Sequence, residues 1–198
     1  AHGLPETAFV IKIIQTTGDL VQDRPLSEIG GKGLFTVEIE ESLINGSIDI
    51  AVHSMKDMPT QLPDGLTIST LLLREDVRDS FISRKFKKIK DLPEGSIVGT
   101  SSLRRRAQLL ALRPDLNIVE FRGNVQTRLR KLDEGVAEAT FLACAGLLRL
   151  NLKDLINPIA ISEMLPAVAQ GAIGIEQKTD NRQVRELLAP IHDQETEL

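Results

Sequence analysis

The sequence predicts an α/β protein made of two lobes. Along most of its 198 residues, short apolar runs typical of buried strands alternate with segments of helical periodicity. Two crossings, near residues 74–79 and 166–171, divide these elements into two groups. The simplest arrangement joins two lobes by these crossings and returns the last strand and helix to the first lobe. A ligand is then expected in a cleft between the lobes.

Composition limits the class of protein. Hydrophobic residues make up 41%, and the only aromatic residues are six Phe, so the core must be largely aliphatic. The net charge of -4 gives no hint of a nucleic-acid partner. Cys144 is the one cysteine, which excludes an internal disulfide and favours a reducing, cytoplasmic location. We expect no membrane span, no signal peptide and, with three scattered histidines, no metal site.

The first segment predicts a strand, a glycine-rich loop and a helix. Residues 9–14, FVIKII, have the composition of a strand. Residues 23–33 hold three glycines around Lys32, typical of a mobile lid or a phosphate cradle, but they lack the P-loop spacing. Residues 34–45 carry apolar side chains on one helical face, and Gly46 is a suitable C-terminal cap.

The stretch around which the chain is organised is 53–59, HSMKDMP. It follows an apolar run, 48–52, that predicts a buried strand, and its proline prevents the strand from continuing. Lys56 and Asp57 thus lie at the end of a buried strand, where α/β proteins usually place their chemistry. The alternative is a solvated turn with an incidental Lys–Asp pair.

The next elements lead into a second group of strands. Residues 66–73 form an apolar, β-branched run, and the charged residues 74–79 interrupt it. Residues 80–83 predict a short strand, and 91–95 a turn.

A strand at 96–99 runs into three hydroxyl residues and then into a helix at 103–112. The hydroxyl residues are Thr100, Ser101 and Ser102. Such residues cap a helix and leave free backbone N–H groups that suit an anion. Arg104, Arg105 and Arg106 lie in the first turn, where cations oppose the helix dipole and a bound anion would relieve the conflict. The alternative is a basic, solvated helix face.

A second strand, 116–121, also leads to an arginine at a helix start. Arg122, Gly123 and Asn124 follow it, and Asn124 can cap a helix at 125–132 that Gly135 ends. Residues 101–131 contain eight basic and two acidic residues, a charge of +6 in a chain of net charge -4. A local basic region in an acidic protein favours a specific acidic ligand over a diffuse polyanion.

The last part of the chain continues the alternation. Residues 139–143 predict a strand, followed by a short helix that carries Arg149. Residues 165–171 form a loop that leads into a strand at 172–176, and 180–188 predict an amphipathic helix.

Together these motifs closely resemble the porphobilinogen deaminase (hydroxymethylbilane synthase) family. In order, they are GGKGLF at 30–35, DIAVHSMKDMP at 49–59, GTSSLRR at 99–105, FRGNVQTRLRKL at 121–132 and LPAVAQGAIGIE at 165–176. The resemblance implies a transferase of porphyrin and heme biosynthesis that joins four porphobilinogen molecules head to tail and releases ammonia at each step. It also implies a covalently held dipyrromethane cofactor as primer.

The resemblance assigns Asp57 as the catalytic carboxylate. Loss of ammonia from an aminomethylpyrrole leaves a cationic azafulvene, and a carboxylate can stabilise that cation, help protonate the leaving amine and take up the ring proton after coupling. The acetate and propionate arms of the substrate explain a basic lining, since arginine's fork matches a carboxylate. The residues that the resemblance implies for substrate or cofactor binding are Lys32 (in the lid), Ser54, Lys56, Thr100, Ser101, Ser102, Arg104, Arg105, Arg122, Gly123, Arg128, Arg149 and Gln170. Arg106 is assigned no role.

Two departures from the family follow. Its members begin with an additional strand and helix, and they continue into a third domain whose cysteine anchors the cofactor. We therefore expect this chain to contain only the first two domains of the family. The resemblance does not imply that such a truncated form is active by itself. Domain 1 is expected at 1–73 plus 173–198 and domain 2 at 78–166. Cys144 lies in a predicted buried strand and is not the anchor.

Two other functions are compatible with parts of the sequence. A two-lobed module that binds a carboxylate or another anion without catalysis would share this periplasmic-binding-protein-like architecture. A nucleic-acid binder could use Arg104–Arg106, but the chain has no Trp or Tyr for stacking and its net charge is negative. We therefore expect a monomeric enzyme whose partner is porphobilinogen, with neither nucleic acid nor membrane involved.

Overall fold

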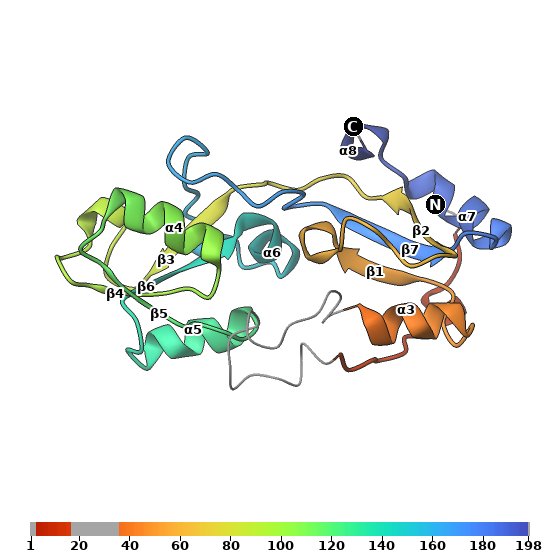
Figure 1. Ribbon diagram of the computed structural model, residues 1–198, viewed down its shortest axis with the longest axis horizontal. Helices are drawn as coiled ribbons and strands as arrows, with labels where there is room; N and C mark the ends of the chain where they lie inside the picture. The colour runs from red at the N-terminus through yellow and green to blue at the C-terminus, as the bar shows by residue number, and fades with distance from the viewer. Residues whose placement is uncertain (1–2, 17–35, 198) are drawn as a thin grey trace. The chain divides into compact units, whose positions relative to one another are not determined.

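The computed structural model describes residues 3–16 and 36–197 (Figure 1). The chain forms two compact units. Unit 1 combines Ala1–Arg74 with Ala172–Leu198, and unit 2 is the intervening Glu75–Gly171. Each unit contains a sheet and helices, which confirms the α/β prediction. The predicted lid at 23–33, including Lys32, lies outside the described residues.

Unit 1 is built on an antiparallel sheet of three strands in the order β1-β7-β2. The strands are β1 (Ala51–Ser54), β2 (Leu66–Leu71) and β7 (Ile173–Lys178). β7 is the central strand, although it comes last in the sequence. The helices of unit 1 are η1 (Glu6–Ala8), α3 (Val37–Ile44), η2 (Met55–Asp57), α7 (Arg182–Leu188), η5 (Ala189–Ile191) and α8 (Gln194–Glu197).

The core of unit 1 lies between α3 and the sheet. Leu43 of α3 packs with Ala51 of β1 and Leu66 of β2, and all three are buried. α3 ends as predicted, because Gly46 adopts a φ of 74°, which suits glycine.

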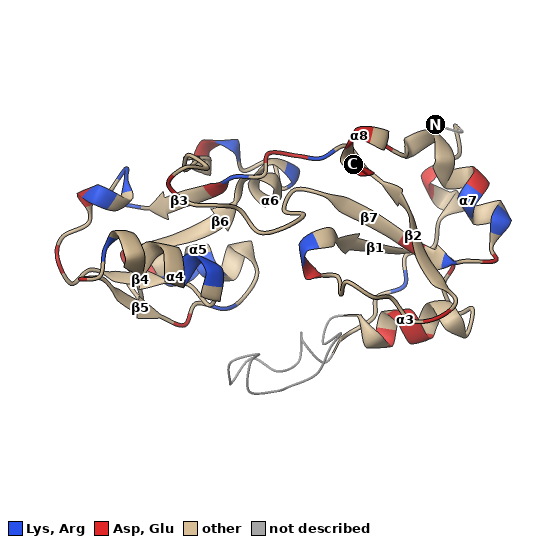
Figure 2. Ribbon diagram, turned by 45° about the horizontal axis from the view of Figure 1, so that its top comes forward, with Lys and Arg blue, Asp and Glu red and all other residues tan. Residues whose placement is uncertain are grey.

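Figure 2 shows acidic residues along α3 and basic residues around α5 of unit 2.

The strand predicted at 9–14 is not formed, and that prediction was wrong. Val10, Ile11 and Ile13 are 94%, 89% and 89% exposed, and the segment belongs to neither sheet. The apolar composition is that of a strand, but a strand also needs a neighbour for its ladder, which composition alone cannot supply.

Unit 2 is built on a mixed sheet in the order β3-β6-β4-β5. β3 pairs with β6 antiparallel, whereas β4 runs parallel to both β5 and β6. The strands are β3 (Asp79–Ser83), β4 (Ile97–Gly99), β5 (Asn117–Val119) and β6 (Ala139–Ala143). The helices are η3 (Ile89–Asp91), α4 (Leu103–Leu112), α5 (Val125–Asp133), α6 (Cys144–Arg149) and η4 (Lys153–Leu155).

The sheet of unit 2 is buried on both faces. Successive residues of a strand point to opposite faces. Phe81 and Phe141 accordingly belong to one apolar cluster, whereas the next residues, Ile82 and Leu142, belong to another. The two Phe rings lie 6.0 Å apart between centroids. This explains the continuous apolar runs of the sequence.

The helix starts of unit 2 follow from their capping residues. Ser102 Oγ accepts a hydrogen bond from the Arg105 backbone N–H at 3.4 Å. Asn124 Oδ1 accepts one from Thr127 N–H at 2.8 Å. Both caps confirm the prediction, and Gly135 ends α5 with a φ of 75°. Within 3–16 and 36–197, no helix is long and apolar enough to cross a bilayer.

Gly99 at the end of β4 is expected to tolerate no side chain. A Cβ there would lie 2.3 Å from the ring of Phe121, which is completely buried. We expect Gly99→Ala to lower the free energy of unfolding by about 1–3 kcal/mol, the usual effect of overpacking. Gly146→Ala in α6 is the matched control, since a Cβ there meets nothing within 4 Å. Equal denaturation midpoints for the two variants would contradict this prediction.

Candidate functional site

Unit 1 contains a polar pocket of about 310 Å³ at the end of β1. Its polar lining consists of Thr16, Thr36, His53, Ser54 and Asp57. Asp57 is exposed at the end of η2, the single turn that follows β1. The structure therefore places Ser54 and Asp57 at one pocket, with Lys56 exposed on the same turn.

Met55 fixes η2 on the sheet. Its backbone N–H donates to Ala172 O at 3.1 Å, directly beyond the last pair of β1 and β7. Its side chain occupies the space above Gly174, where a Cβ would lie 2.3 Å from Met55 Sδ. The glycine in β7 and the methionine before Lys56 thus hold Asp57 at the strand end.

A buried His–Glu pair lies beside this pocket. His53 Nε2 is 2.9 Å from Glu176 Oε2, with side-chain exposures of 6% and 0%. The sequence analysis did not single out either residue, because Glu176 lies 123 positions away in β7.

In unit 2, three of the predicted site residues converge on one buried carboxylate, Asp79. Arg104 Nη2 donates to Asp79 Oδ2 at 2.7 Å, and Arg105 Nη2 donates to Oδ1 at 2.6 Å. Gln170 Nε2 donates to the same Oδ1 at 3.0 Å. Burial acts to raise the pKa of Asp79, but the hydrogen bonds and charge of Arg105, with the hydrogen bonds from Arg104 and Gln170, hold that pKa below its ordinary value.

The three arginines at the start of α4 differ in their surroundings. Arg105 is 6% exposed and also donates to Phe141 O at 2.9 Å, so it does not fit the alternative of a solvated basic face. Arg104 is half-buried and also donates to Leu165 O. Arg106 is exposed. A role of Arg104 or Arg105 in binding a substrate carboxylate stays a prediction.

The hydroxyl groups before α4 accept hydrogen bonds from the backbone. Thr100 Oγ1 accepts from Ser102 N–H at 3.2 Å, and Ser101 Oγ accepts from Phe121 N–H at 2.9 Å. Ser102 Oγ is the helix cap. Among the described residues, the hydroxyl hydrogens of Ser101 and Ser102 have no acceptor. They can therefore be donated to an anion.

Guanidinium groups crowd together at the start of α5. Arg128 is half-buried, and its Nε donates to Gly123 O at 2.8 Å. Burial, followed by the charges of Arg105 and Arg122, lowers the pKa of Arg128. Gly123 has a φ of 115°, and a Cβ there would lie 2.6 Å from Thr127, so only glycine fits at this turn.

The remaining predicted residue of unit 2, Arg149 at the end of α6, is exposed. Its Nη2 donates to Gly171 O at 2.7 Å, next to Gln170. Arg105, Arg122 and Arg128, of which the first two act electrostatically on the third, form one cationic region, whereas Arg149 contacts the backbone beside Gln170. Lys32 lies outside the described residues.

Asp79 is the residue that the sequence analysis missed in unit 2. The sequence alone places it in the charged crossing at 74–79. Two features of the sequence indicate a role for Asp79. It directly precedes a predicted strand, and the three consecutive arginines of a predicted helix need a carboxylate as counterion. Its partners lie 25, 26 and 91 positions away, so the sequence does not place them together.

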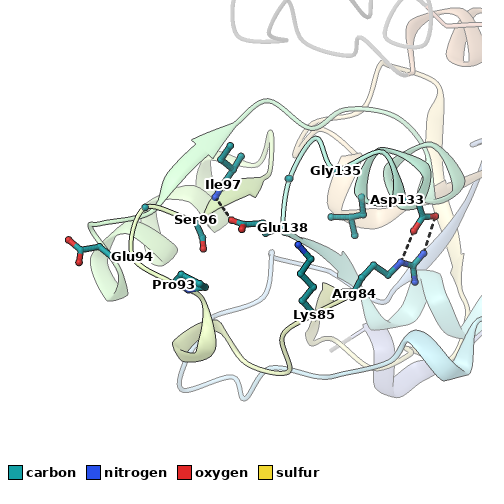
Figure 3. A pocket seen from close by; sticks show the side chains of 12 residues that line it. Arg84, Lys85, Pro93, Glu94, Ser96, Ile97, Asp133, Gly135 and Glu138 are labelled. Atoms are coloured by element: carbon teal, nitrogen blue, oxygen red, sulfur yellow. Dashed lines mark hydrogen bonds and ion pairs between the residues drawn. The ribbon is translucent and has the colours of Figure 1, made fainter.

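A larger pocket, of about 700 Å³, lies elsewhere in unit 2 and contains none of the predicted residues (Figure 3). Its charged groups are largely engaged within the protein. Arg84 Nε donates to Asp133 at 2.7 Å, and Glu138 accepts from the Ile97 N–H at 2.9 Å. Its size alone therefore does not make it the candidate site.

A family model described as porphobilinogen deaminase, dipyromethane cofactor binding domain, matches residues 2–186. The porphobilinogen deaminase of Paracoccus denitrificans (strain Pd 1222) is 61% identical over the whole of this chain, and that of Nitrobacter hamburgensis is 56% identical. The chain spans 64% and 63% of the length of these two relatives, less than two thirds.

Solved structures of low sequence identity share the fold. A putative lipoprotein from Clostridium difficile 630 superposes with a TM-score of 0.54 at 14% identity, covering 82% of this chain and 77% of its own. A nutrient binding protein from Burkholderia cenocepacia, bound to methionine, gives 0.53 at 18% identity, with coverages of 81% and 78%. These similarities confirm the α/β fold class of the periplasmic-binding-protein type.

Proposed function

Because this chain belongs to the porphobilinogen deaminase family, we propose that it forms the first two domains of an enzyme of tetrapyrrole biosynthesis. The enzyme condenses four porphobilinogen molecules into hydroxymethylbilane and releases ammonia at each step. The proposed domains are residues 1–73 plus 173–198 and residues 78–166.

The observation that carries this proposal is the crowding of Arg128 by Arg105 and Arg122. Burial lowers the pKa of Arg128, and the like charges of Arg105 and Arg122 lower it further. Among the described residues, Arg128 has no carboxylate partner, and its hydrogen bond goes to a backbone carbonyl. An anionic ligand would relieve this repulsion, and each porphobilinogen ring brings two carboxylates.

The same groups fit the dipyrromethane cofactor. Arg122 and Arg128, with the hydroxyl hydrogens of Ser101 and Ser102, form a set of donors suited to carboxylate arms. When bound, this cofactor supplies the pyrrole to which the first substrate is joined. Cys144 is buried in the core, and burial raises the pKa of its thiol to about 11, so it is unsuited to anchor the cofactor.

We propose Asp57 as the catalytic carboxylate. When the C–N bond of the aminomethyl group breaks, the electron pair leaves on nitrogen and the pyrrole becomes a cationic azafulvene. An ionised carboxylate near that cation lowers the barrier, because the attraction is strongest in the transition state. Asp57 is exposed at the pocket, so a substrate can reach it.

The direct test uses this sequence completed to the length of its relatives, called the extended protein below. We expect porphobilinogen to be consumed with one ammonia released per molecule and a linear tetrapyrrole formed, measured by mass spectrometry and an ammonia assay. Binding of porphobilinogen without release of ammonia would contradict the proposal and favour the anion-binding module.

The role of the cationic region is tested by Arg128→Leu. Removal of a charge-assisted hydrogen bond, about 1.5–3 kcal/mol, is expected to raise KM for porphobilinogen about 10- to 150-fold. Arg106→Leu is the matched control, because Arg106 is exposed and has no assigned role. If steady-state kinetics give the same KM for both variants, Arg128 does not hold a substrate carboxylate.

A further inference from the structure

Unit 1 contains two His–Glu pairs with different surroundings. His192 Nε2 and Glu197 Oε2 lie 3.2 Å apart, with side-chain exposures of 19% and 66%. His53 and Glu176 are 2.9 Å apart and have exposures of only 6% and 0%. Taking a carboxylate out of water is costly, so a buried pair of this kind needs a reason.

The pair is held by the central strand of the sheet. Ala51 of β1 lies opposite Glu176 of β7, and His53 is two residues further along the same face of β1. Within the described residues, Glu176 Oε1 has no hydrogen-bond partner, so the imidazole is the partner of this carboxylate. Glu176 therefore fixes the orientation of the His53 ring.

His53 also lines the pocket that contains Asp57 and Ser54. Among the described residues, its second ring nitrogen, Nδ1, has no hydrogen-bond partner. If Nε2 carries the hydrogen that Glu176 accepts, Nδ1 presents a lone pair. A base oriented by a buried carboxylate beside a reactive site is the arrangement that catalytic dyads and triads use.

We propose that His53, oriented by Glu176, carries the proton that is transferred during each condensation. This inference rests on the proposed function. The C–N bond of the protonated aminomethyl group breaks with its electron pair staying on nitrogen, which forms neutral ammonia; a C–C bond then forms between the freed methylene carbon and the α-carbon of the accepting pyrrole. The C–H electron pair of that α-carbon returns to the ring, and its proton passes to His53 Nδ1. Ammonia takes up this proton and leaves as ammonium.

A division of labour between His53 and Asp57 has a physical reason. A carboxylate that accepts the ring proton loses the charge that stabilises the azafulvene cation. A separate proton carrier lets Asp57 remain ionised throughout the cycle. Imidazole suits this task, because one ring nitrogen can accept a proton while the other donates to Glu176.

The kinetic test replaces His53 by Gln in the extended protein. We expect kcat to fall about 10²-fold or more, the usual effect of losing a general base, with KM changed less than about threefold. Glu176→Gln is expected to lower kcat less, because the ring remains present. His192→Gln, which alters the exposed pair, is the matched control and should leave kcat unchanged.

An isotope effect separates a proton carrier from a structural role. With porphobilinogen deuterated at its free α-carbon, we expect His53→Gln to show a primary kinetic isotope effect larger than that of the wild type, since loss of the base slows cleavage of the C–H bond. A fall in kcat without an increased isotope effect would overturn the proposal. So would a variant that keeps kcat within about threefold of the wild type.

A second measurement is made on the wild-type chain, so it requires neither catalytic activity nor a stable variant. Long-range ¹⁵N NMR spectra of the wild-type chain are expected to show His53 as the Nε2–H tautomer, with Nδ1 as an acceptor. The Nδ1–H tautomer would overturn the proposal. Failure of the proposed function gives a different result from failure of the His53 proposal. In that case the wild-type extended protein releases no ammonia, and both proposals are wrong.

Discussion

Replacement of Asp57 by Asn is expected to lower kcat of the extended protein by about 10²- to 10³-fold, the usual loss when one preorganised electrostatic group is removed. The side chain keeps its size and loses its charge, so the azafulvene cation loses its counterion. KM for porphobilinogen should change much less, because the charge of Asp57 acts mainly in the transition state. Steady-state kinetics with porphobilinogen measure both quantities.

Asp64→Asn is the matched control for that experiment. Asp64 is an exposed aspartate of the same unit, and it does not line the pocket that contains Asp57. We expect its replacement to leave kcat within about a factor of two, as is usual for surface positions. If Asp57→Asn retained more than half of the wild-type turnover, Asp57 would be neither the stabilising carboxylate nor an acid or base of the reaction.

The second large effect is expected from Asp79→Asn, and it concerns stability. This change leaves the buried Arg105 without its carboxylate and also removes the partner of Arg104. Breaking a buried pair by removing one member costs about 3–5 kcal/mol. We expect a loss of that size in the free energy of opening of unit 2, measured by hydrogen exchange of the β3 and β6 amides.

Asp133→Asn is the control, because Asp133 forms an ion pair with Arg84 in which both side chains are about half exposed. Such surface pairs contribute about 1 kcal/mol or less. Similar losses for the two variants would show that the network around Asp79 contributes no more than a surface pair.

The hydrogen bonds of Asp79 with Arg104, Arg105 and Gln170 make the stability of unit 2 depend on pH in the acidic range. The pKa of Asp79 is lower in the folded state than its ordinary value, so the folded protein binds this proton less readily than the unfolded chain. The contribution of ionised Asp79 to the free energy of unfolding is complete above the ordinary pKa of about 3.9. It is lost as the pH falls through the lowered pKa of the folded state. Asp79→Asn should therefore reduce the pH dependence of unfolding in that acidic range.

Local signals predicted the elements that depend on neighbours in the sequence. α4 begins and ends at the predicted residues, because Ser102 caps it and Arg113-Pro114 cannot continue it. The strand expected at 9–14 failed for the opposite reason, since a ladder requires a partner that local composition does not specify.

The same distinction applies to the candidate site. The residues that cluster in unit 2 were named from their motifs, but Asp79 was missed because Gln170 meets it across 91 positions. The pair of His53 and Glu176 spans 123 positions. Apolar periodicity predicts which side chains are buried, whereas the partner of a buried charge is fixed only by the assembled sheet.

The place of β7 in the sheet of unit 1 has a consequence for synthesis on the ribosome. β1 and β2 emerge early, but both pair with β7, which is made about a hundred residues later than β2. Unit 2 is one continuous segment, closed by the hydrogen bond from Glu75 N–H to Gly171 O at 3.2 Å. Unit 2 can fold while β1 and β2 still lack their central strand. Unit 2 can thus be complete before the sheet of unit 1, and β1 and β2 have unpaired edges in the interval.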